Sequence, residues 1–231
     1  MIANPNIQIL EAAVARLGTL AEKMAFVGGC ATGLLLTDPA ASPVRATLDV
    51  DVIVEVATLA RYHWLSDQLR QIGFIEDTSE DAPICRWKAD DVILDVMPTN
   101  PKILGFGNQW FTPAYEASEW TDLPSGKQIR LLQAPYFLVT KFEAFACRGK
   151  NDYLMSRDME DIVTVIDGRP EIVAEIKQAS EALKAYLVAC CSGLLKERDF
   201  LDALPGHLLP DAASQARSVV VINRLKDISG G

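Results

Sequence analysis

One run of the chain, LDVDVIVEV at residues 48–56, constrains the fold more than any other. Valine occupies every second position from Val50 to Val56, a period of two that is typical of a β-strand. Asp49 and Asp51 alternate with these valines, so both carboxylates lie on the opposite face of the strand. Adjacent carboxylates repel each other unless a cation lies between them. The run therefore indicates either a cation site or a strand face that is open to water.

A second apolar run, VILDVM at residues 92–97, carries another acidic residue, Asp95. A buried carboxylate is costly unless it is paired with a positive charge or a metal ion. If this strand packs beside the first, three carboxylates meet at one point. Such a group suits Mg²⁺ or Mn²⁺, which prefer oxygen ligands, and two such ions could clamp a triphosphate. The alternative is that Asp95 lies at an exposed edge of the sheet.

The pair Gly28–Gly29 follows the short apolar run AFV and precedes a predicted helix. A glycine turn at a helix N-terminus lets backbone N–H groups approach phosphate oxygens, although the pair is also compatible with a plain tight turn. The pattern is not G-x-G-x-x-G, because Cys30 stands at the place of the second glycine. It also lacks the lysine of a phosphate-binding P-loop. Nucleotide transfer therefore fits better than NAD-dependent oxidoreduction, for which no proton-transfer group is evident.

Periodicity predicts an α/β front half and a helical back half. The expected elements are helices 6–23, 30–37 and 58–72 and strands 25–27, 49–56, 84–88 and 92–97. The last two strands form a hairpin around KADDV at 88–92, and residues 100–130 are expected to form loops with short strands. From Ala134 the pattern is mainly helical, with Pro135 in a first turn and breaks at 168–170 and 204–210.

The composition sets limits on the class of protein. The 231 residues are 49% hydrophobic, which is enough for one large core or two small ones. A net charge of −9 argues against an extended nucleic-acid surface, which is usually basic. No apolar run is long enough to span a membrane, and the N-terminus does not resemble a signal peptide. The five cysteines lack metal-binding spacing, which favours reduced core thiols in a cytoplasmic protein.

These motifs together resemble a known superfamily. Gly28–Gly29, a variable helix, RATLDVDVIV at 45–54 and ILDV at 93–96 are similar to the DNA polymerase β-type nucleotidyltransferases. The stretch YFLVTKFEAFACRGKNDYLMSRDMEDIVTVIDGR at 136–169 resembles the AbiEii/AbiGii toxin-like branch. The resemblance covers about residues 25–170. It implies an α+β fold, with a small mixed β-sheet nucleotidyltransferase core and flanking helices over residues 1–130 and a mainly helical domain over 131–231.

The resemblance also assigns roles within the front half. Asp49, Asp51 and Asp95 would bind Mg²⁺ or Mn²⁺, and Asp95 would align or deprotonate the attacking hydroxyl. Gly28 and Gly29 would shape the turn that binds the phosphates of the NTP. The family commonly has Gly-Ser or Gly-Gly at this turn, so a hydroxyl contact at Gly29 is absent.

Further residues would complete the site. Arg45 and Thr47, just before the acidic pair, are expected to contact the nucleotide. Lys141 would reach the triphosphate, and Asp158 and Asp161 would support that lysine or the catalytic base. Two alternatives remain open: the ammonium of Lys141 reaches the surface from an apolar helix, and Asp158 is an ordinary acidic residue at a helix start.

The predicted activity is metal-dependent transfer of an NMP from an NTP to a hydroxyl, with release of pyrophosphate. The resemblance suggests a tRNA end or a protein side chain as acceptor, and a cognate antitoxin as a possible partner. Two alternatives stay open: a small antibiotic of the aminoglycoside type as acceptor, or a non-catalytic module that binds a nucleotide or a partner protein.

Overall fold

The computed structural model describes residues 5–230 of a mixed α+β protein, and the chain forms two compact units. The first unit comprises Met1–Gly33 and Arg45–Gln133, and the second comprises Leu34–Val44 and Ala134–Gly231. The outer ends of the two expected domains, residues 1–4 and 231, lie outside the described residues. Residues 34–44, which the sequence places in the front half, belong with the helices of the second unit.

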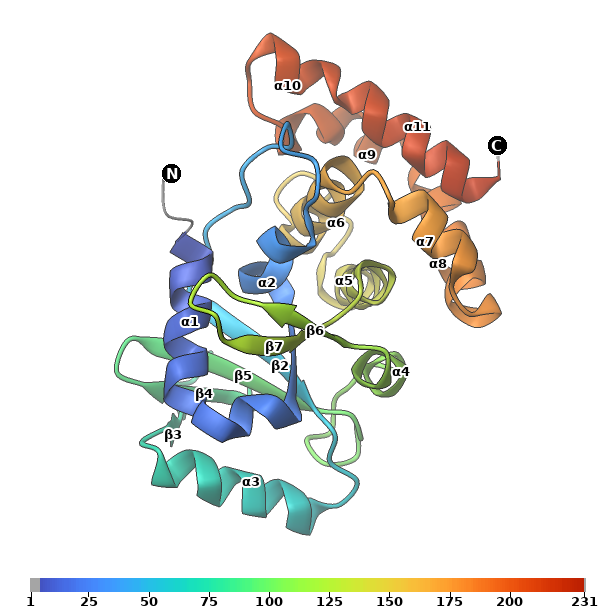
Figure 1. The fold of residues 1–231 in the computed structure, drawn as a ribbon. Helices are drawn as coiled ribbons and strands as arrows, with labels where there is room; N and C mark the ends of the chain where they lie inside the picture. The colour runs from blue at the N-terminus through green and yellow to red at the C-terminus, as the bar shows by residue number, and fades with distance from the viewer. Residues whose placement is uncertain (1–4, 231) are drawn as a thin grey trace. The chain divides into compact units, whose positions relative to one another are not determined.

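The first unit is built on a seven-stranded sheet with the strand order β3-β4-β5-β2-β1-β7-β6 (Figure 1). Its strands are β1 Met24–Val27, β2 Asp49–Val54, β3 Ile75–Glu76, β4 Arg86–Ala89, β5 Val92–Pro98, β6 Glu119–Asp122 and β7 Gln128–Leu131. The pairs β2–β5 and β1–β7 are parallel, and the other neighbouring pairs are antiparallel. The mixed sheet expected from the sequence is therefore present.

In the central strand β2, acidic residues alternate with valine only at the beginning, and the burial of the strand explains why. Val50 and Val52 are fully buried, whereas Asp49 and Asp51 on the other face are half-buried. From Ile53 onward the strand is buried on both faces, since Ile53 is also 0% exposed. The strand ends at Val54, two residues before the end predicted from the valine repeat. The partly open face is thus confined to the beginning of β2, where the two carboxylates lie.

Helices α1 Pro5–Leu17 and α4 Phe111–Glu116 and the 3₁₀ helix η1 Gly18–Lys23 pack against this sheet. Helix α3 Leu59–Gln71 belongs to the same unit, and α2 Gly28–Leu35 begins in it and ends in the second unit. Helix α1 packs on β2 and β5 (Figure 1), and its apolar stripe consists of the buried residues Leu10, Ala13, Val14 and Leu17. The helix predicted over 6–23 changes to a 3₁₀ helix at Gly18, which has a left-handed φ of 55°. The short helix α4 was missed, because the Pro- and Gly-rich stretch around it favours loops.

The predicted hairpin between β4 and β5 is confirmed. Ala89 pairs with Val92, so Asp90 and Asp91 form a two-residue turn. Asp90 has a positive φ of 50°, which aspartate tolerates better than most residues. The first of the two strands begins at Arg86, two residues later than expected.

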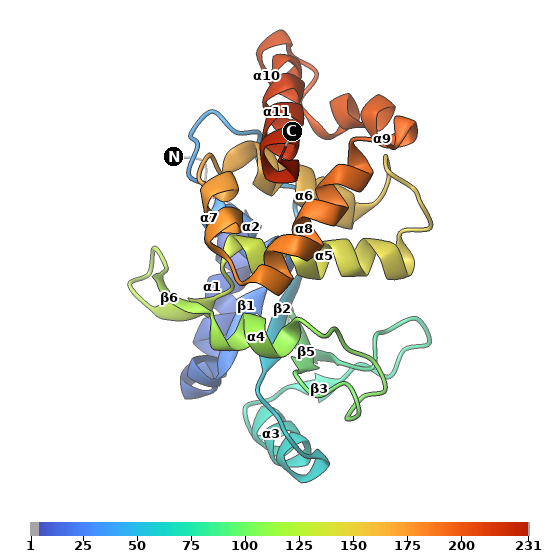
Figure 2. The same cartoon turned by 90° about the vertical axis from the view of Figure 1, so that its right-hand side faces the viewer.

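The second unit is helical. Its elements are α5 Ala134–Arg148, α6 Arg157–Gly168, α7 Ile172–Gln178, α8 Glu181–Leu194, α9 Arg198–Ala203, η2 Leu204–His207, α10 Ala212–Ala216 and α11 Ser218–Ser229. Helix α5 packs on α6 and α8, and α8 packs on α11 (Figure 2). Pro135 lies in the first turn of α5, as predicted, and the break at 168–170 separates α6 from α7.

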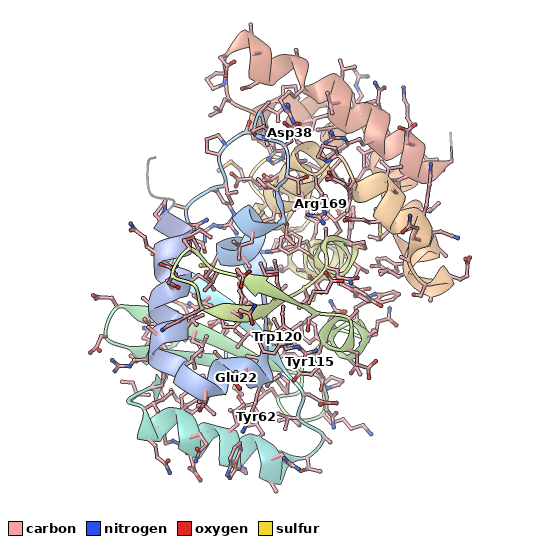
Figure 3. The ribbon with its side chains drawn as sticks, in the orientation of Figure 1. Glu22, Asp38, Tyr62, Tyr115, Trp120 and Arg169 are labelled. Atoms are coloured by element: carbon pink, nitrogen blue, oxygen red, sulfur yellow. The ribbon has the colours of Figure 1, made fainter. Side chains whose placement is uncertain are left out.

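Residues 34–44 are tied to these helices by polar contacts. The Arg169 side chain donates to the carbonyl of Leu35, and the hydroxyl of Thr37 donates to Glu171. The backbone N–H groups of Thr37 and Asp38 both donate to the carbonyl of Gly168. Figure 3 shows Asp38 on the segment after α2 and Arg169 at the end of α6. These contacts explain why the segment belongs to the helical unit.

Within residues 5–230, no helix combines the length and the apolar character that a membrane crossing requires. All five cysteines are free thiols. Cys30, Cys85 and Cys191 are buried, whereas Cys147 is exposed, so the expectation of core thiols is wrong for Cys147. It lies one residue before the end of α5, where the helix meets solvent.

Candidate functional site

The three acidic residues of the predicted metal site lie on two adjacent parallel strands. Asp51 on β2 is the direct Cα partner of Asp95 on β5. Directly opposed residues of a sheet point to the same face, and Asp49 shares that face because it precedes Asp51 by two residues. Asp95 is buried, with 6% of its surface exposed, and the other two residues are half-buried. The structure therefore gathers three carboxylates on one face of the sheet.

An arginine that the sequence reasoning missed lies between two of these carboxylates. Arg86 on β4 is the antiparallel partner of Asp95. Its Nε donates to Asp95 Oδ1 at 2.8 Å and its Nη2 to Asp95 Oδ2 at 2.7 Å. The same Nη2 donates to Asp49 Oδ2 at 2.9 Å. The signal in the sequence was incomplete, because the predicted turn KADDV at 88–92 did not fix the register of the hairpin; position 86 lies opposite position 95 only when Asp90 and Asp91 alone form the turn.

The charges of this group shift one another's protonation equilibria. The hydrogen bonds and charge of Asp95, with the charge of Asp49, raise the pKa of Arg86 further above its ordinary value. Burial alone would raise the pKa of Asp49, but the Thr47 hydrogen bond and the Arg86 charge outweigh it and lower the pKa. The Asp49 carboxylate is therefore held in its charged form and attracts cations.

Thr47 and Arg45 lie just before β2 and contact its first carboxylate and the glycine turn. The hydroxyl of Thr47 donates to Asp49 Oδ1 at 2.6 Å. A Cβ atom at Gly29 would lie 2.7 Å from Nη2 of Arg45, so the guanidinium lies close to the glycine backbone. Both residues predicted to contact the nucleotide are thus beside the acidic pair.

Asn6 of α1 holds this loop in place and was also missed. It is 1% exposed, and its side-chain oxygen accepts from the backbone N–H of Thr47 at 3.1 Å. Its side-chain amide donates to the carbonyls of Arg45 at 2.8 Å and Gly29 at 3.4 Å. Asn6 lies one helical turn before Leu10 on the buried stripe of α1. A polar residue on an apolar stripe was the available signal, because such a group must find partners when buried.

Gly28 brings the start of α2 against Asp51. Its φ of 80° is left-handed, a conformation that favours glycine. A Cβ at this position would lie only 1.9 Å from Asp51 Oδ2, so the carboxylate occupies the space that a side chain would need. The glycine turn therefore borders the carboxylate group, with the N-terminal end of α2 beside it.

The remaining predicted residues form a second charged cluster, within the helical unit. Lys141 Nζ of α5 lies 2.6 Å from Asp161 Oδ2 and 3.5 Å from Asp158 Oδ1, both on α6. Arg148 donates to both oxygens of Asp158 at 2.8 Å. The Lys141 side chain is 10% exposed, so the alternative in which its ammonium reaches the surface is wrong.

Asp158 is both an acidic residue at a helix start and a partner of Lys141, the two roles that the sequence left open. It lies in the first turn of α6 after the N-cap Ser156, where a negative charge is favourable, and it also contacts Lys141. Burial would raise its pKa, but the hydrogen bonds from Arg148 and the charge of Lys141 outweigh burial and lower the pKa. The structure thus brings Lys141, Asp158 and Asp161 together in the second unit, while the three carboxylates belong to the first.

The donor chemistry of the carboxylate group bears on whether it fits a divalent ion. Among residues 5–230, no group of three or more His, Cys, Asp or Glu side chains is arranged as a metal-binding cluster. Asp95 is committed to Arg86, whereas Asp49 and Asp51 share a partly open face. Mg²⁺ often takes only one or two protein carboxylates and completes its shell with phosphate oxygens and water. Asp49 and Asp51 fit an ion of that kind.

Comparison with known proteins finds no matching family model and no matching curated protein. Among solved structures, an antigenic nucleotidyltransferase-like protein from Paracoccidioides brasiliensis has a TM-score of 0.48 and 19% identity, covering 88% of this chain and 94% of that one. The antibiotic-resistance factor ANT(2'')-Ia has a TM-score of 0.48 and 15% identity, covering 82% of this chain and 94% of that one. Similarity at this level assigns neither a family nor an activity to the chain.

Proposed function

We propose that the protein is a nucleotidyltransferase that moves an NMP from an NTP to a hydroxyl acceptor, with Mg²⁺ or Mn²⁺ as cofactor. One observation carries the proposal: Asp51 and Asp95 are opposed in parallel register, with Asp49 on the same face and Gly28 against Asp51. A carboxylate group beside a glycine turn offers ligands for a cation and backbone N–H donors for phosphate. The sequence resemblance to polymerase β-type nucleotidyltransferases points to the same chemistry.

The site residues of the first unit each have a role in this reaction. Asp49 and Asp51 hold the divalent ion, and Thr47 orients Asp49 through its hydrogen bond. When bound, the ion supplies positive charge that neutralises the triphosphate. The backbone of Gly28 and Gly29 donates N–H groups to phosphate oxygens.

The transfer itself forms one bond and breaks another. The acceptor oxygen forms a bond to the α-phosphorus while the bond from that phosphorus to the pyrophosphate oxygen breaks. Asp95 aligns the acceptor and takes the proton that the acceptor hydroxyl loses. Arg45, whose guanidinium lies beside Gly29, offers positive charge to the phosphates. Pyrophosphate is the leaving group.

The acceptor is proposed on the sequence resemblance alone. The stretch 136–169 suggests a tRNA end or a protein side chain, and with it a toxin-like role and a cognate antitoxin. A small antibiotic of the aminoglycoside type is the alternative acceptor. The net charge of −9 favours acceptors that do not need an extended basic surface. The roles of Lys141, Asp158 and Asp161 in nucleotide binding also stay predictions from the resemblance.

A non-catalytic nucleotide-binding module is the second candidate, and the contacts of Arg86 favour it. The guanidinium neutralises Asp95, the proposed proton acceptor, in bidentate geometry. A module of this kind would bind an NTP without transferring its nucleotidyl group.

The test replaces the two carboxylates that hold the ion. Asp49→Asn together with Asp51→Asn should abolish transfer from α-³²P-labelled NTPs to tRNA, protein or aminoglycoside acceptors, because neutral amides cannot hold the cation. The double variant should also lose the rise in melting temperature that NTP and Mg²⁺ give the parent protein. Asp81→Asn with Asp91→Asn is the control, since it removes two exposed carboxylates of the same unit.

Three results would decide between the candidates. Transfer by the parent and the control but not by the Asp49/Asp51 variant supports the enzyme. Metal-dependent stabilisation by NTP without transfer to any acceptor supports the binding module. Transfer by the Asp49/Asp51 variant at the parent rate rules out the proposed site.

A further inference from the structure

Arg86 places a positive charge where the proposed reaction needs a different cation. Its Nη2 contacts Asp95 Oδ2 at 2.7 Å and Asp49 Oδ2 at 2.9 Å, so one nitrogen joins both carboxylates. An ion bound at Asp49 would have to share that carboxylate with the guanidinium. Two cations on the same carboxylates repel each other, so Arg86 and the ion compete for Asp49.

The surroundings of Arg86 allow its head group to move. Its side chain is 21% exposed, whereas the Asp95 carboxylate beneath it is 9% exposed. Lys141 in the second unit is a contrast, since its side chain and those of both partner carboxylates are at most 10% exposed. Water can therefore solvate the Arg86 guanidinium when it leaves Asp49. A phosphate offers the guanidinium another partner, because guanidinium pairs with phosphate in bidentate geometry as it does with carboxylate.

The charge balance then determines the order of binding. Arg86 donates to Asp95 and Asp49, and the charge of Arg45 also acts on Asp49, so a divalent ion alone gains little because it displaces a cation that is already bound. A triphosphate adds several negative charges, which satisfy the displaced guanidinium and the ion together. The nucleotide and the ion should each raise the affinity for the other by the same factor.

We infer that Arg86 is a displaceable counter-cation, which holds Asp49 and Asp95 in the free protein and makes binding of the divalent ion depend on the nucleotide. The inference rests on the proposed function and adds a positioning residue to it. In the free protein Arg86 keeps the like-charged carboxylates together. In the loaded protein it turns to the phosphates.

The experiment measures Mn²⁺ binding by the loss of the free-ion signal in electron paramagnetic resonance. The full chain is titrated alone and with an equimolar mixture of the α,β-methylene analogues of ATP, CTP, GTP and UTP, which cannot transfer the NMP. For the parent protein, the analogues should lower the Kd for Mn²⁺ about 10-fold or more, in the usual range of coupling between two sites.

The variant Arg86→Gln removes the competing charge. It should bind Mn²⁺ without nucleotide about 10-fold more tightly than the parent, and the analogues should then add little. Lys88→Gln is the matched control. Lys88 lies two residues further along β4, pairs with Asp77 at 2.7 Å, and its loss changes the net charge equally. Lys88→Gln should leave both the Mn²⁺ affinity and the nucleotide coupling at the parent values.

A second variant covers the case in which Arg86→Gln does not fold. Arg86→Lys keeps the charge but loses the bidentate contact, so its Mn²⁺ affinity should lie between those of the parent and Arg86→Gln. Circular dichroism at the titration temperature shows which variants are folded. The parent titration needs no variant, and it tests the coupling once the Mn²⁺ that the analogues bind without protein has been subtracted.

The outcomes separate this inference from the proposed function. If the parent binds Mn²⁺ equally well with and without the analogues, Arg86 does not couple the two ligands and the inference is overturned, whereas labelled-NMP transfer can still succeed. If Arg86→Gln merely melts earlier with an unchanged Mn²⁺ affinity, the arginine is only structural. If the parent binds neither Mn²⁺ nor the analogues, the inference and the proposed function both fail.

Discussion

The space beside Gly28 determines where the carboxylate of Asp51 can lie. A Cβ atom at Gly28 would lie 1.9 Å from Oδ2, 2.6 Å from Cγ and 2.9 Å from Cβ of Asp51. Because the side chain of aspartate is short, a shift of its tip cannot relieve all three contacts. The glycine is therefore needed both for its left-handed φ and for the absence of a side chain.

Gly28→Ala and Gly126→Ala form a matched pair that separates these two needs. Both glycines have a φ of 80°, but nothing lies within 4 Å of a Cβ at Gly126. We expect Gly126→Ala to lower the free energy of unfolding by about 1 kcal/mol through backbone strain. Gly28→Ala should lower it by about 2–4 kcal/mol, because overpacking against Asp51 adds to the strain.

Urea denaturation of the two variants measures the difference, and nucleotide binding with Mg²⁺ gives a second readout. Gly28→Ala should also lose metal-dependent stabilisation by NTP, because it displaces Asp51, whereas Gly126→Ala should retain it. Equal losses of stability in the two variants would show that Asp51 moves aside without cost.

At the scale of elements, the sequence of helix α6 both starts the helix and places Asp158 in contact with α5. Ser156 caps the helix by accepting from the backbone N–H of Met159 at 3.3 Å, and Asp158 and Glu160 follow in the first turn. The buried residues Ile162 and Ile166 line one face. Asp158 is thereby fixed at the position from which it contacts Lys141 and Arg148.

Ser156→Ala tests how much this cap contributes. We expect the free energy of unfolding to fall by about 1 kcal/mol, because the N–H of Met159 loses its partner. Ser156→Asn is the control and should stay within a few tenths of the parent value, since asparagine caps helices equally well. Chemical denaturation compares the three proteins, and amide hydrogen exchange of Met159 should accelerate only in the alanine variant. Unchanged stability in Ser156→Ala would mean that the packing of α6 alone determines its start.

At the scale of the whole molecule, one arginine joins three distant parts of the chain. The Nε of Arg217 contacts Asp167 at 2.8 Å, and its Nη2 contacts Asp38 at 2.7 Å. Asp167 is 1% exposed, and burial raises its pKa despite the hydrogen bond from Arg217. This cluster fastens the segment 34–44 to the helices of the second unit.

Arg217→Leu should therefore destabilise the protein strongly. It leaves Asp167 buried without its main ion pair, and we expect the free energy of unfolding to fall by about 3 kcal/mol. Arg198→Leu is the control, because Arg198 is 90% exposed and lies 3.7 Å from Asp202. That change should cost less than about 1 kcal/mol. Urea denaturation followed by circular dichroism measures both, and similar losses would contradict the view that the Arg217 cluster holds the segment.

Local patterns in the sequence were sufficient for the elements that carry the site, although not for the short helix α4. The valine repeat predicted β2, the KADDV turn predicted the β4–β5 hairpin, and the periodicity after Ala134 predicted the helical back half. These features depend on residues close together in the chain, where side-chain spacing and turn preferences determine the backbone. The position of Asp49 and Asp51 on one strand face was predictable for the same reason.

Only the tertiary structure decided which residues meet. The parallel pairing of β2 with β5 places Asp51 opposite Asp95, and Asn6 reaches Thr47 across 41 residues of sequence. The contact of Arg86 with Asp49 likewise depends on the order of the strands. Such contacts are determined by how the whole core packs, because the same local preferences are compatible with several strand orders. The sequence by itself therefore determined most of the elements and the chemistry that they carry, and the packing of the core decided which charged groups meet across segments that are distant in the sequence.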